Sequence, residues 1–422
     1  MRRAYPTELR GDTEIKTIYV DITELSIYGQ KTGIQRVVRN ICRQLDQLGT
    51  TSYEIRYVIA IAGKYFELDV AFVAKVIASK SDVTSGSVGA NASGIAAIGK
   101  KLLSSIPFVY RYAQRRYAAY RLNKFIKDQF GGALKARVSF DKDSTVLLMD
   151  SFWNGSSVLE AVRRAKKQGA TIVCMIYDII AITHSRLYIP ALSQAFTWHC
   201  DRMVIYSDNI LTISNFSKSE ILQAYPFLLA QNVQVIRLGA DFSESTKCQE
   251  PSRNSKQFLT VGTVEIRKRH EIILKAFELL WGRGVDVHWT IIGKRGWRTE
   301  QLIENIEKSP ELGRRLHWLQ NADDEELRSN YLTCNSTIIA SEVEGYGLPI
   351  IEALMLKSGV IASDIPVFRE VGGDQAIYFD LNDPEALALK IEMLSKDINT
   401  VPRPDIQPSS WREAAQDVLD AL

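Results

Sequence analysis

The sequence is poor in the features that mark secreted and membrane-spanning proteins. It has five cysteines in 422 residues, and none of them forms a Cys-x-x-Cys pair. This pattern excludes a disulfide framework and argues against a structural zinc site, so we expect free thiols in a reducing cytosol. No stretch reaches the roughly 18 uninterrupted apolar residues of a membrane span, and the first residues lack the apolar segment of a secretory signal. Together these absences predict a cytoplasmic location.

A large excess of either charge is also absent. Lysine and arginine number 52 and the acidic residues 49, and the net charge of +3 is too small to argue for a nucleic-acid partner. One segment departs from this balance, because residues 100–127 are basic and interleaved with tyrosines. With the small, polar residues 79–97 before it, this segment predicts a basic helical insertion near 79–130. Two interpretations stay open: peripheral contact with an anionic membrane, at the inner face of the plasma membrane, and a solvated helix with packed tyrosines.

The length and the alternation of apolar patterns predict an α/β fold. A chain of 422 residues is too long for one ordinary core and about right for two domains. β-branched runs alternate with segments of helical periodicity, which favours two doubly wound parallel sheets. We expect an N-terminal domain over 1–242, a polar linker over 243–256, a C-terminal domain over 257–400 and a final helical segment over 401–422. The expected strands are residues 17–22, 53–61, 144–150, 170–178, 258–263, 288–293, 315–319, 336–340 and 359–363.

The densest group of candidate functional residues lies in residues 341–366, between a predicted strand and a predicted helix. Glu344 and Glu352 are separated by seven residues, and the glycines and Pro349 between them suit close backbone approach and a helix start. Glu352, inside the helix, can accept hydrogen bonds from a ribose diol, while Glu344 in the loop can hold sugar hydroxyls. A glycine-rich connection with two solvated acids is the alternative. The N–H groups at this helix start would cradle phosphate or hydroxyl groups, and they belong to Gly345, Tyr346, Gly347 and Leu348.

A second candidate group follows the first strand of the C-terminal domain. Arg267 and Lys268 are two cations with no acid partner inside their loop, a pattern that suits a diphosphate. Fixed cations stabilise the charge that develops on such a leaving group, and they can replace a divalent metal. Arg269 leaves open which two side chains meet the phosphates, and a solvated basic loop is the alternative interpretation. Secondary candidates for contact with phosphate or sugar are Gly293 and Lys294.

Taken together, these motifs resemble glycosyltransferase family 4. EGYGLPIIEAL (344–354) resembles the acidic nucleotide-sugar motif of that family, and TVGTVEIRKRHEIILKAF (260–277) resembles its strand–loop–helix with an Arg-Lys pair. TIIGKRGW (290–297) resembles a loop common in the mannosyltransferase-like branch, and LTISNFSKSEI (211–221) matches the family's pattern earlier in the chain. The resemblance covers roughly residues 170–420.

The resemblance implies a GT-B fold, in which two Rossmann-like domains face a central cleft. It implies retaining glycosyl transfer without a metal or other cofactor. The C-terminal domain would bind a nucleotide-diphosphate sugar, and the N-terminal domain a saccharide or lipid-diphosphate-linked acceptor. Glu344 would orient the donor sugar, Glu352 the ribose, and Arg267 with Lys268 the diphosphate. The branch points to GDP-mannose and to bacterial surface polysaccharide synthesis, and the last helix would cross back to the first domain.

Further candidates lie after predicted strands of the N-terminal domain. Gly33 opens a helix whose dipole would meet donor phosphate or the acceptor, and a plain helix N-terminus is the alternative. Asp178 is a catalytic candidate, since it matches the aspartate of a His-Asp pair found in many relatives. Tyr177 replaces the histidine and is a poor base near neutral pH, so the histidine's role cannot be carried over. The candidates for contact with the acceptor are Asp150, Tyr177 and His184.

Two rival functions remain open. One is another nucleotide-sugar enzyme of the same fold, such as an epimerase; a phosphorylase would need a lysine site for pyridoxal phosphate, which the sequence does not show. The other is a catalytically inactive scaffold in a polysaccharide assembly complex. The tyrosine at position 177 favours the scaffold, whereas the intact glutamate and Arg-Lys motifs oppose it. Turnover of the donor separates these functions from glycosyl transfer.

Overall fold

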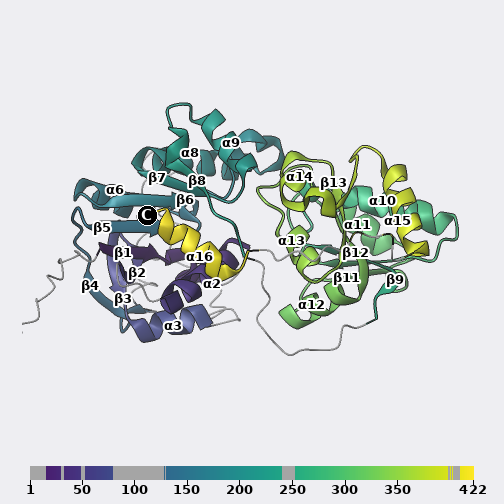
Figure 1. Ribbon diagram of the computed structural model, residues 1–422, viewed down its shortest axis with the longest axis horizontal. Coiled ribbons are helices and arrows are strands. Elements are labelled where there is room, and N and C mark those ends of the chain that lie inside the picture. Colours follow the sequence, from purple (N-terminus) through teal and green to yellow (C-terminus); the bar gives the residue numbers. More distant parts are fainter. Residues whose placement is uncertain are drawn as a thin grey trace, which may run out of the picture. The chain divides into compact units, whose positions relative to one another are not determined.

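The computed structural model has two β-sheets flanked by helices, and the predicted α/β architecture is confirmed (Figure 1). Most of the predicted insertion near 79–130 and residues 243–251 of the predicted linker lie outside the residues that the structure describes. None of the helices within the described ranges combines the length and apolarity that a bilayer crossing requires. The described residues are 16–29, 33–48, 53–78, 128, 130–239, 252–397, 400, 402 and 409–422.

The first sheet has eight strands in the order β4-β3-β2-β1-β5-β6-β7-β8. Strand β1 lies between β2 and β5 and is parallel to both, as the βαβ pattern predicts. The strands are β1 (Lys16–Asp21), β2 (Tyr53–Ile61), β3 (Lys64–Leu68), β4 (Leu134–Arg137), β5 (Ser144–Leu148), β6 (Thr171–Met175), β7 (Asn209–Thr212) and β8 (Val233–Val235).

One edge of this sheet differs from the predicted parallel arrangement. Strand β3 is antiparallel to both β2 and β4. The two-residue connection between β2 and β3 explains the hairpin, because Ala62 and Gly63 have φ angles of 50° and 71°. Two left-handed residues in a row match the twist of a tight hairpin. Alanine rarely adopts this conformation, so Gly63 was the only residue of the pair that favours a tight turn.

Helices pack against this sheet through apolar faces. Helix α2 (Gly33–Leu48) buries Val37, Val38, Ile41 and Leu45, whose spacing places them on one face of the helix. The other helices of this part are α1 (Thr23–Tyr28), α3 (Val70–Ala78), α6 (Ser156–Lys167), α7 (Ile180–Thr183), α8 (Pro190–Tyr206) and α9 (Asn215–Ala224), with short 3₁₀ turns η1 (Phe152–Asn154), η2 (Ser185–Leu187) and η3 (Ala230–Asn232).

The second sheet has six strands in the order β11-β10-β9-β12-β13-β14, and all its paired strands are parallel. Its core includes Phe277 and Trp289, whose rings stack at 5.5 Å between centroids. The strands are β9 (Asn254–Val261), β10 (His288–Ile292), β11 (Leu316–Leu319), β12 (Cys334–Ile339), β13 (Gly359–Ser363) and β14 (Ile377–Phe379). The helices and turns are η4 (Ile266–Lys268), α10 (His270–Gly282), α11 (Glu300–Lys308), α12 (Asp324–Thr333), α13 (Leu348–Met355), α14 (Pro366–Gly372), η5 (Gly373–Gln375) and α15 (Pro384–Lys396).

The last helix, α16 (Trp411–Asp420), begins with a complete capping box between Ser410 and Glu413. It lies against the segment after β8. A Cβ atom at Gly239 would collide with the backbone of Trp411, and Arg237 pairs with Asp417 at 3.2 Å. The close backbone approach at Gly239 therefore requires glycine.

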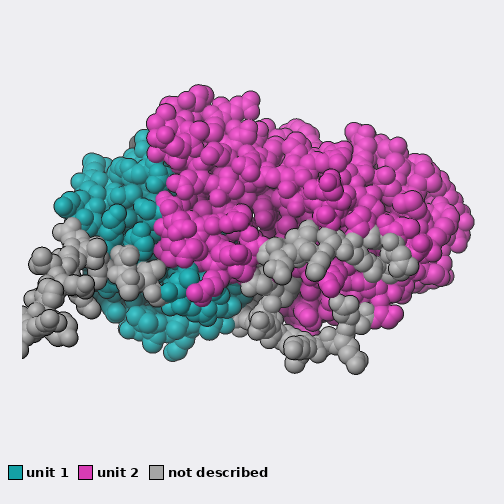
Figure 2. Space-filling view, in the orientation of Figure 1, with its two compact units in different colours: residues 1–175, 198–210, 422 teal, residues 176–197, 211–421 magenta. Residues whose placement is uncertain are grey.

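By its contacts the chain divides into two compact units (Figure 2). Unit 1 comprises residues 1–175, 198–210 and 422, and unit 2 comprises residues 176–197 and 211–421. The segments 176–197 and 211–239, which the sequence analysis places in the N-terminal domain, group here with the second sheet. Their hydrogen bonds to the loops of that sheet, described below, account for this grouping.

Candidate functional site

The main group of predicted site residues meets at one edge of the second sheet. Strands β9 and β12 are neighbours and parallel, so their carboxyl ends lie at the same edge. The loop after β9 leads into η4, which carries Arg267 and Lys268, and the loop after β12 carries Glu344. Glu342 in that second loop also donates its backbone N–H to the Arg267 carbonyl at 2.8 Å. The two loops are therefore bonded to each other directly.

Arg267 is the centre of this group. Its guanidinium forms an ion pair with Glu344 and another with Glu265, whose Oε1 lies 2.7 Å from Arg267 Nη2. Lys268 Nζ lies 3.7 Å from Glu344 Oε1, and Ser341 donates a hydrogen bond of 2.9 Å to the same oxygen. We call Asp178, Glu265, Arg267, Lys268 and Glu344 the Arg267 cluster.

The Arg267 cluster includes an acid that the sequence analysis overlooked. The prediction that Arg267 and Lys268 have no acid partner inside their loop is wrong, because Glu265 pairs with Arg267. Glu265 is only 3% exposed. A buried carboxylate needs a cationic or hydrogen-bonding partner, and Arg267 provides one. Its place two residues before Arg267 was the available signal.

The carboxyl groups of the cluster differ in the direction of their pKa shifts. Burial raises the pKa of Glu344, but Arg267 and Lys268 outweigh it and hold that pKa below its usual value. Burial raises the pKa of Glu265 and of Asp178, with Arg267 opposing the rise in both. Perturbed carboxyl groups around one arginine are typical of functional sites.

Asp178 comes to this cluster from the segment after β6. Its carboxylate lies about 3.0 Å from the position that a Cβ atom of Gly345 would occupy, so glycine is required at 345. The Gly345 carbonyl accepts hydrogen bonds from Ser214 at 2.7 Å and from Ser217 at 3.1 Å. These serines lie at the start of α9, in the LTISNFSKSEI motif, so this motif holds the acidic loop in place.

The turn that leads into α13 has the predicted helix-start geometry. Gly347 is the N-cap residue with a φ of 108°, and a Cβ atom there would press on the ring of Phe368. Leu348 is the first residue of the helix, and Pro349 lies in its first turn. Tyr346 is partly buried, and burial raises the pKa of its hydroxyl to about 12.

Glu352 lies inside α13, as expected, and is 3% exposed. The Tyr331 hydroxyl donates a hydrogen bond of 2.8 Å to Glu352 Oε2. The tyrosine on α12 therefore fixes the orientation of this carboxylate.

Gly293 and Lys294 lie beside the loop that follows β9. Gly262 donates its N–H to the Ile292 carbonyl and Val264 to the Lys294 carbonyl. The Lys294 side chain is exposed. Gly293 has no room for a Cβ atom, which would collide with the Gly262 carbonyl. This glycine therefore permits close packing of the two loops.

Trp297, a few residues further along that loop, contacts the segment 185–188. Its indole N–H donates to the Leu187 carbonyl at 3.3 Å, and its ring contacts Tyr188 at 6.0 Å between centroids. Burial raises the pKa of Tyr188, and its hydroxyl interacts electrostatically with Asp178 and Arg267. The sequence analysis did not single out Tyr188, since no pattern relates it to residues so distant in the chain.

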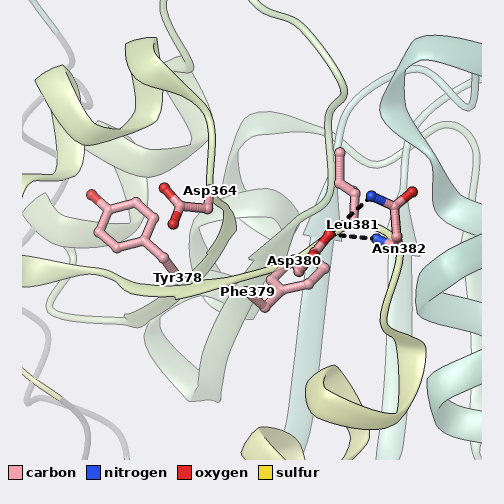
Figure 3. A pocket seen from close by; sticks show the side chains of 6 residues that line it. All are labelled: Asp364, Tyr378, Phe379, Asp380, Leu381 and Asn382. Atoms are coloured by element: carbon pink, nitrogen blue, oxygen red, sulfur yellow. Dashed lines mark hydrogen bonds between the residues drawn. The ribbon is translucent and has the colours of Figure 1, made fainter.

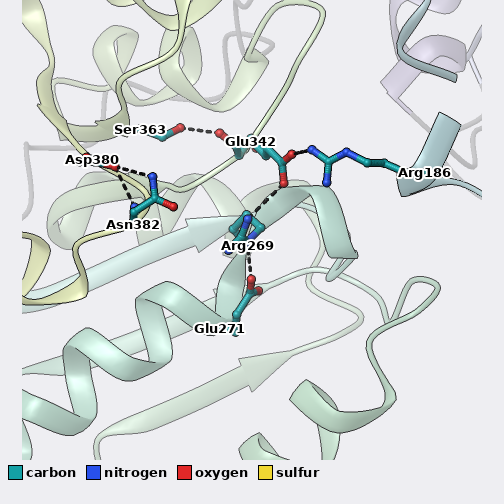
Figure 4. Close-up of polar contacts among 8 residues, drawn as sticks. Arg186, Arg269, Glu271, Glu342, Ser363, Asp380 and Asn382 are labelled. Carbon is teal, nitrogen blue, oxygen red and sulfur yellow. Dashed lines mark hydrogen bonds and ion pairs between the residues drawn. The ribbon is translucent and has the colours of Figure 1, made fainter. Parts of the chain in front are cut away.

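Arg269 points to other partners than Arg267 does. It pairs with Glu271 and, at 3.1 Å, with Glu342, which also pairs with Arg186 (Figure 4). Its φ of 47° marks a left-handed turn between η4 and α10. The geometry therefore singles out Arg267 and Lys268 as the two cations beside Glu344.

The remaining candidates near Asp178 have local surroundings. Tyr177 is 6% exposed, so its side chain lies in the interior. His184 is partly exposed and its Nδ1 lies 2.9 Å from the Thr183 hydroxyl. Both remain predictions as residues that contact the acceptor.

Gly33 and Asp150 belong to unit 1. Gly33 is exposed at the start of α2. Asp150 is buried, and its carboxylate accepts hydrogen bonds from the Leu25 N–H at 2.6 Å and the Gln35 amide at 3.1 Å. Burial raises the pKa of Asp150 to about 6. Its oxygens tie the end of β5 to α1 and α2, which is a structural role beside the predicted one.

A separate pocket lies where β13 and β14 end (Figure 3). It has a volume of about 420 Å³ and includes two carboxylates, those of Asp364 and Asp380. Arg369 pairs with Asp364 and stacks on the Tyr378 ring at 3.9 Å. Arg369 is already paired with Asp364, and the second carboxylate, Asp380, would repel phosphate. The Arg267 cluster is therefore the better diphosphate candidate. The other residues that line the pocket are Phe379, Leu381 and Asn382.

Sequence comparison shows which known proteins this chain resembles. Residues 242–417 match the family described as "Glycosyl transferases group 1". The chain is 28% identical to the serotype-specific mannosyltransferase WbdA of Escherichia coli over 436 aligned positions. This alignment covers 96% of this chain and 45% of WbdA. It is 29% identical to O-antigen chain mannosyltransferase B of Escherichia coli over 49% of this chain and 53% of that protein.

Solved structures agree with the fold. Sucrose-phosphate synthase from Thermosynechococcus elongatus matches over 96% of this chain and 94% of its own, with a TM-score of 0.57 and 15% identity. The catalytic domain of starch synthase IV from Arabidopsis thaliana matches over 96% and 98%, with a TM-score of 0.53 and 11% identity. At these identities the likeness concerns the fold alone.

The chain has the GT-B fold, as predicted, in which two Rossmann-like domains are built on two mainly parallel sheets. Residues 242–417 match the glycosyl transferases group 1 family, and the predicted resemblance to glycosyltransferase family 4 and its mannosyltransferase-like branch is confirmed. Nearly all of this chain aligns with the WbdA relatives, but it spans only about half of their length.

Proposed function

We propose that this chain is a retaining glycosyltransferase that moves a sugar from a nucleotide-diphosphate donor to a saccharide or lipid-linked acceptor. The observation that carries the proposal is the Arg267 cluster, in which two cations and Glu344 meet at the carboxyl edge of the second sheet. The cations suit the diphosphate and Glu344 suits the donor sugar, so the reacting bond would lie between them.

In this function each group has a separate task. Arg267 and Lys268 bind the diphosphate and stabilise the charge that it gains as its bond to the anomeric carbon breaks. The acceptor oxygen forms the new bond to that carbon from the same face, and a departing phosphate oxygen takes the acceptor proton. Because two fixed cations balance the leaving group, we propose a reaction that needs no metal. Retention follows from the family resemblance.

We propose mannose from GDP-mannose as the transferred group, in bacterial surface polysaccharide synthesis. The support is that the relatives in Escherichia coli are named as mannosyltransferases, one of them for the O-antigen chain. UDP- and dTDP-sugars are the next candidates. We also propose a cytoplasmic location, with residues 100–127 available for peripheral contact with an anionic membrane.

The first experiment is a thermal-shift screen against GDP, UDP, dTDP and their common sugars, with and without EDTA. A ligand that binds only the folded state at 100 times its Kd adds about 2.7 kcal/mol of stability. We expect a selective shift with GDP or GDP-mannose that EDTA does not change. If no nucleotide shifts the melting temperature, the inactive scaffold becomes the better interpretation.

Donor turnover then separates the enzyme classes. A glycosyltransferase releases nucleoside diphosphate in proportion to acceptor, whereas an epimerase changes the donor sugar without any acceptor. NMR of the product reports whether the anomeric configuration is retained. Glu344→Gln should lower turnover at least about 100-fold, on the scale of losing a key transition-state contact. Glu342→Gln is the matched control, because Glu342 lies in the same loop but pairs with Arg186 and Arg269. Equal turnover by the two variants would remove Glu344 from the mechanism.

A further inference from the structure

Two carboxylates share the guanidinium of Arg267. Glu265 lies 2.7 Å from its Nη2 atom, and Glu344 pairs with its Nη1 atom. Both carboxyl groups are well shielded from water, with 3% and 14% of their side chains exposed, and Arg267 itself is 18% exposed. An arginine held at both ends of its fork has one defined orientation.

This sharing has a consequence for Glu344. In the proposed function Glu344 turns to the hydroxyls of the donor sugar, so its ion pair with Arg267 must loosen. An ion pair this well shielded is costly to break if one charge is left without a partner. Glu265 removes that difficulty, because Arg267 keeps a carboxylate when Glu344 leaves.

The charges of the cluster support the same conclusion. Arg267 and Lys268 carry two positive charges, and Glu265 and Glu344 carry two negative ones when ionised. Glu265 therefore lowers the positive potential that a diphosphate meets. A residue that served only to bind the diphosphate would not be acidic, so the negative charge of Glu265 calls for a different task.

We propose that Glu265 is a positioning residue, which holds Arg267 so that Glu344 is free to engage the donor sugar. This inference rests on the proposed function and adds to it a residue that does not touch the substrate. Glu265 sets the balance between binding of the free nucleotide and turnover.

The chain offers a matched control in Glu271. Both acids flank the Arg-Lys-Arg sequence and each pairs with one arginine of it, Glu265 with Arg267 and Glu271 with Arg269. Glu271 is 36% exposed, and its partner turns toward Glu342 rather than Glu344 (Figure 4). Removing its charge therefore leaves the Arg267–Glu344 pair unchanged.

The test compares Glu265→Gln with Glu271→Gln in two measurements, affinity for GDP by calorimetry and kcat with GDP-mannose. Glutamine at 265 keeps a hydrogen-bond acceptor for Arg267 but removes the charge. We expect Glu265→Gln to bind GDP about threefold more tightly or better, since a negative charge near the diphosphate is gone. Its kcat should fall about tenfold or more, because Glu344 becomes the main counter-charge of Arg267. Glu271→Gln should change both values less than about twofold.

A gain in GDP affinity together with a loss of kcat distinguishes a positioning role of Glu265 from a merely structural one. Parallel loss of GDP affinity and kcat in Glu265→Gln, or an unchanged kcat, overturns the inference. Glu265→Asp keeps the charge, so it should restore the wild-type GDP affinity and part of kcat, and it serves if the glutamine variant does not fold. If it restores neither, the inference also fails. Where the wild-type chain binds none of GDP, UDP and dTDP, the proposed function itself fails, whatever the variants do.

Discussion

Ser214 donates a hydrogen bond of 2.7 Å to the backbone carbonyl of Gly345. The same hydroxyl accepts a hydrogen bond from the Ser217 N–H at 2.9 Å and so caps α9. Gly345 directly follows Glu344, and its position is therefore set by a residue distant in sequence. This relationship connects the stability of a helix start with the orientation of the acidic loop.

Ser214→Ala should therefore lower both stability and turnover. Loss of an N-cap and of a buried hydrogen bond lowers the free energy of unfolding by about 2 kcal/mol. We expect donor turnover to fall more than nucleotide affinity, because the loop that carries Glu344 loses its anchor. Denaturant unfolding and steady-state kinetics measure the two effects.

Ser217→Ala provides the comparison for that variant. Ser217 donates one longer hydrogen bond to Gly345, of 3.1 Å, and its side chain caps no helix. We expect a loss of about 1 kcal/mol in the free energy of unfolding and a smaller effect on turnover. If the two variants behaved alike, the double role of Ser214 would be refuted.

Arg267→Ala and Lys268→Ala should each lower kcat/KM for the donor. A fixed charge that stabilises a leaving group contributes about 2–4 kcal/mol to the transition state, which corresponds to roughly 30- to 1,000-fold. Arg269→Ala should have a much smaller effect, because Arg269 pairs with Glu271 and Glu342. Unchanged kcat/KM in both Arg267 and Lys268 variants would contradict the diphosphate assignment.

Stability needs a separate check in this series. Arg267→Ala leaves the shielded carboxylates of Glu265 and Glu344 without their common partner, which is destabilising. Lys268→Ala leaves the Arg267 ion pairs in place, so it remains informative if the arginine variant unfolds.

Local patterns were sufficient to predict most of the second sheet. The run at 288–293 is apolar and β-branched, and β10 occupies His288–Ile292; the run at 359–363 matches β13 fully. Strand β13 is buried along its whole length and β10 over most of it, so both are rich in apolar residues. The acidic loop and the Arg-Lys pair were also predicted, since each motif is contiguous in sequence.

What the sequence did not reveal depends on contacts between distant segments. Tyr188 reaches Arg267 only through the folded chain, and the bond from Ser214 to Gly345 joins residues 131 positions apart. Glu265 is close to Arg267 in sequence, but only the folded structure shows that the two side chains form an ion pair. Tertiary structure decides whether a charged residue faces a partner or solvent.

Glu352→Gln tests the predicted ribose contact. A carboxylate accepts hydrogen bonds from both hydroxyls of a ribose more strongly than an amide does. We expect the variant to bind GDP about 5- to 20-fold more weakly and to bind 2′,3′-dideoxy-GDP almost as well as the wild type does. Calorimetry with the two nucleotides gives the comparison. An equal loss of affinity for both would show that Glu352 supports the fold of the site and does not contact the ribose.

Tyr331→Phe removes the hydroxyl that donates to Glu352. The carboxylate then loses an orienting bond but keeps its charge. We expect Tyr331→Phe to lose affinity for GDP but not for 2′,3′-dideoxy-GDP, as Glu352→Gln does, but to a smaller extent. If it discriminated less well than Glu352→Gln, the ribose contact would have to be assigned to Tyr331.

Glu24 in unit 1 should make stability depend on pH. Burial raises its pKa to about 7, and Asp150 and Asp21 add to the rise while the hydrogen bond from Asn154 opposes it. In the unfolded chain the group ionises near its ordinary value of 4.5. Between these values the folded chain binds more protons than the unfolded chain, so the stability due to Glu24 falls as pH rises from about 4.5 to 7.

Glu24→Gln removes this dependence, because glutamine stays neutral and can still accept the Asn154 hydrogen bond. At pH 8 the variant should be more stable than the wild type by about 1–3 kcal/mol, since one pKa unit corresponds to about 1.4 kcal/mol. At pH 5 the difference should be much smaller. Urea unfolding at the two pH values measures both, and Glu54→Gln, at a half-exposed position paired with Arg56, is the control. A difference of the same size at pH 5 and pH 8 would mean that Glu24 is ionised in the folded chain across this range.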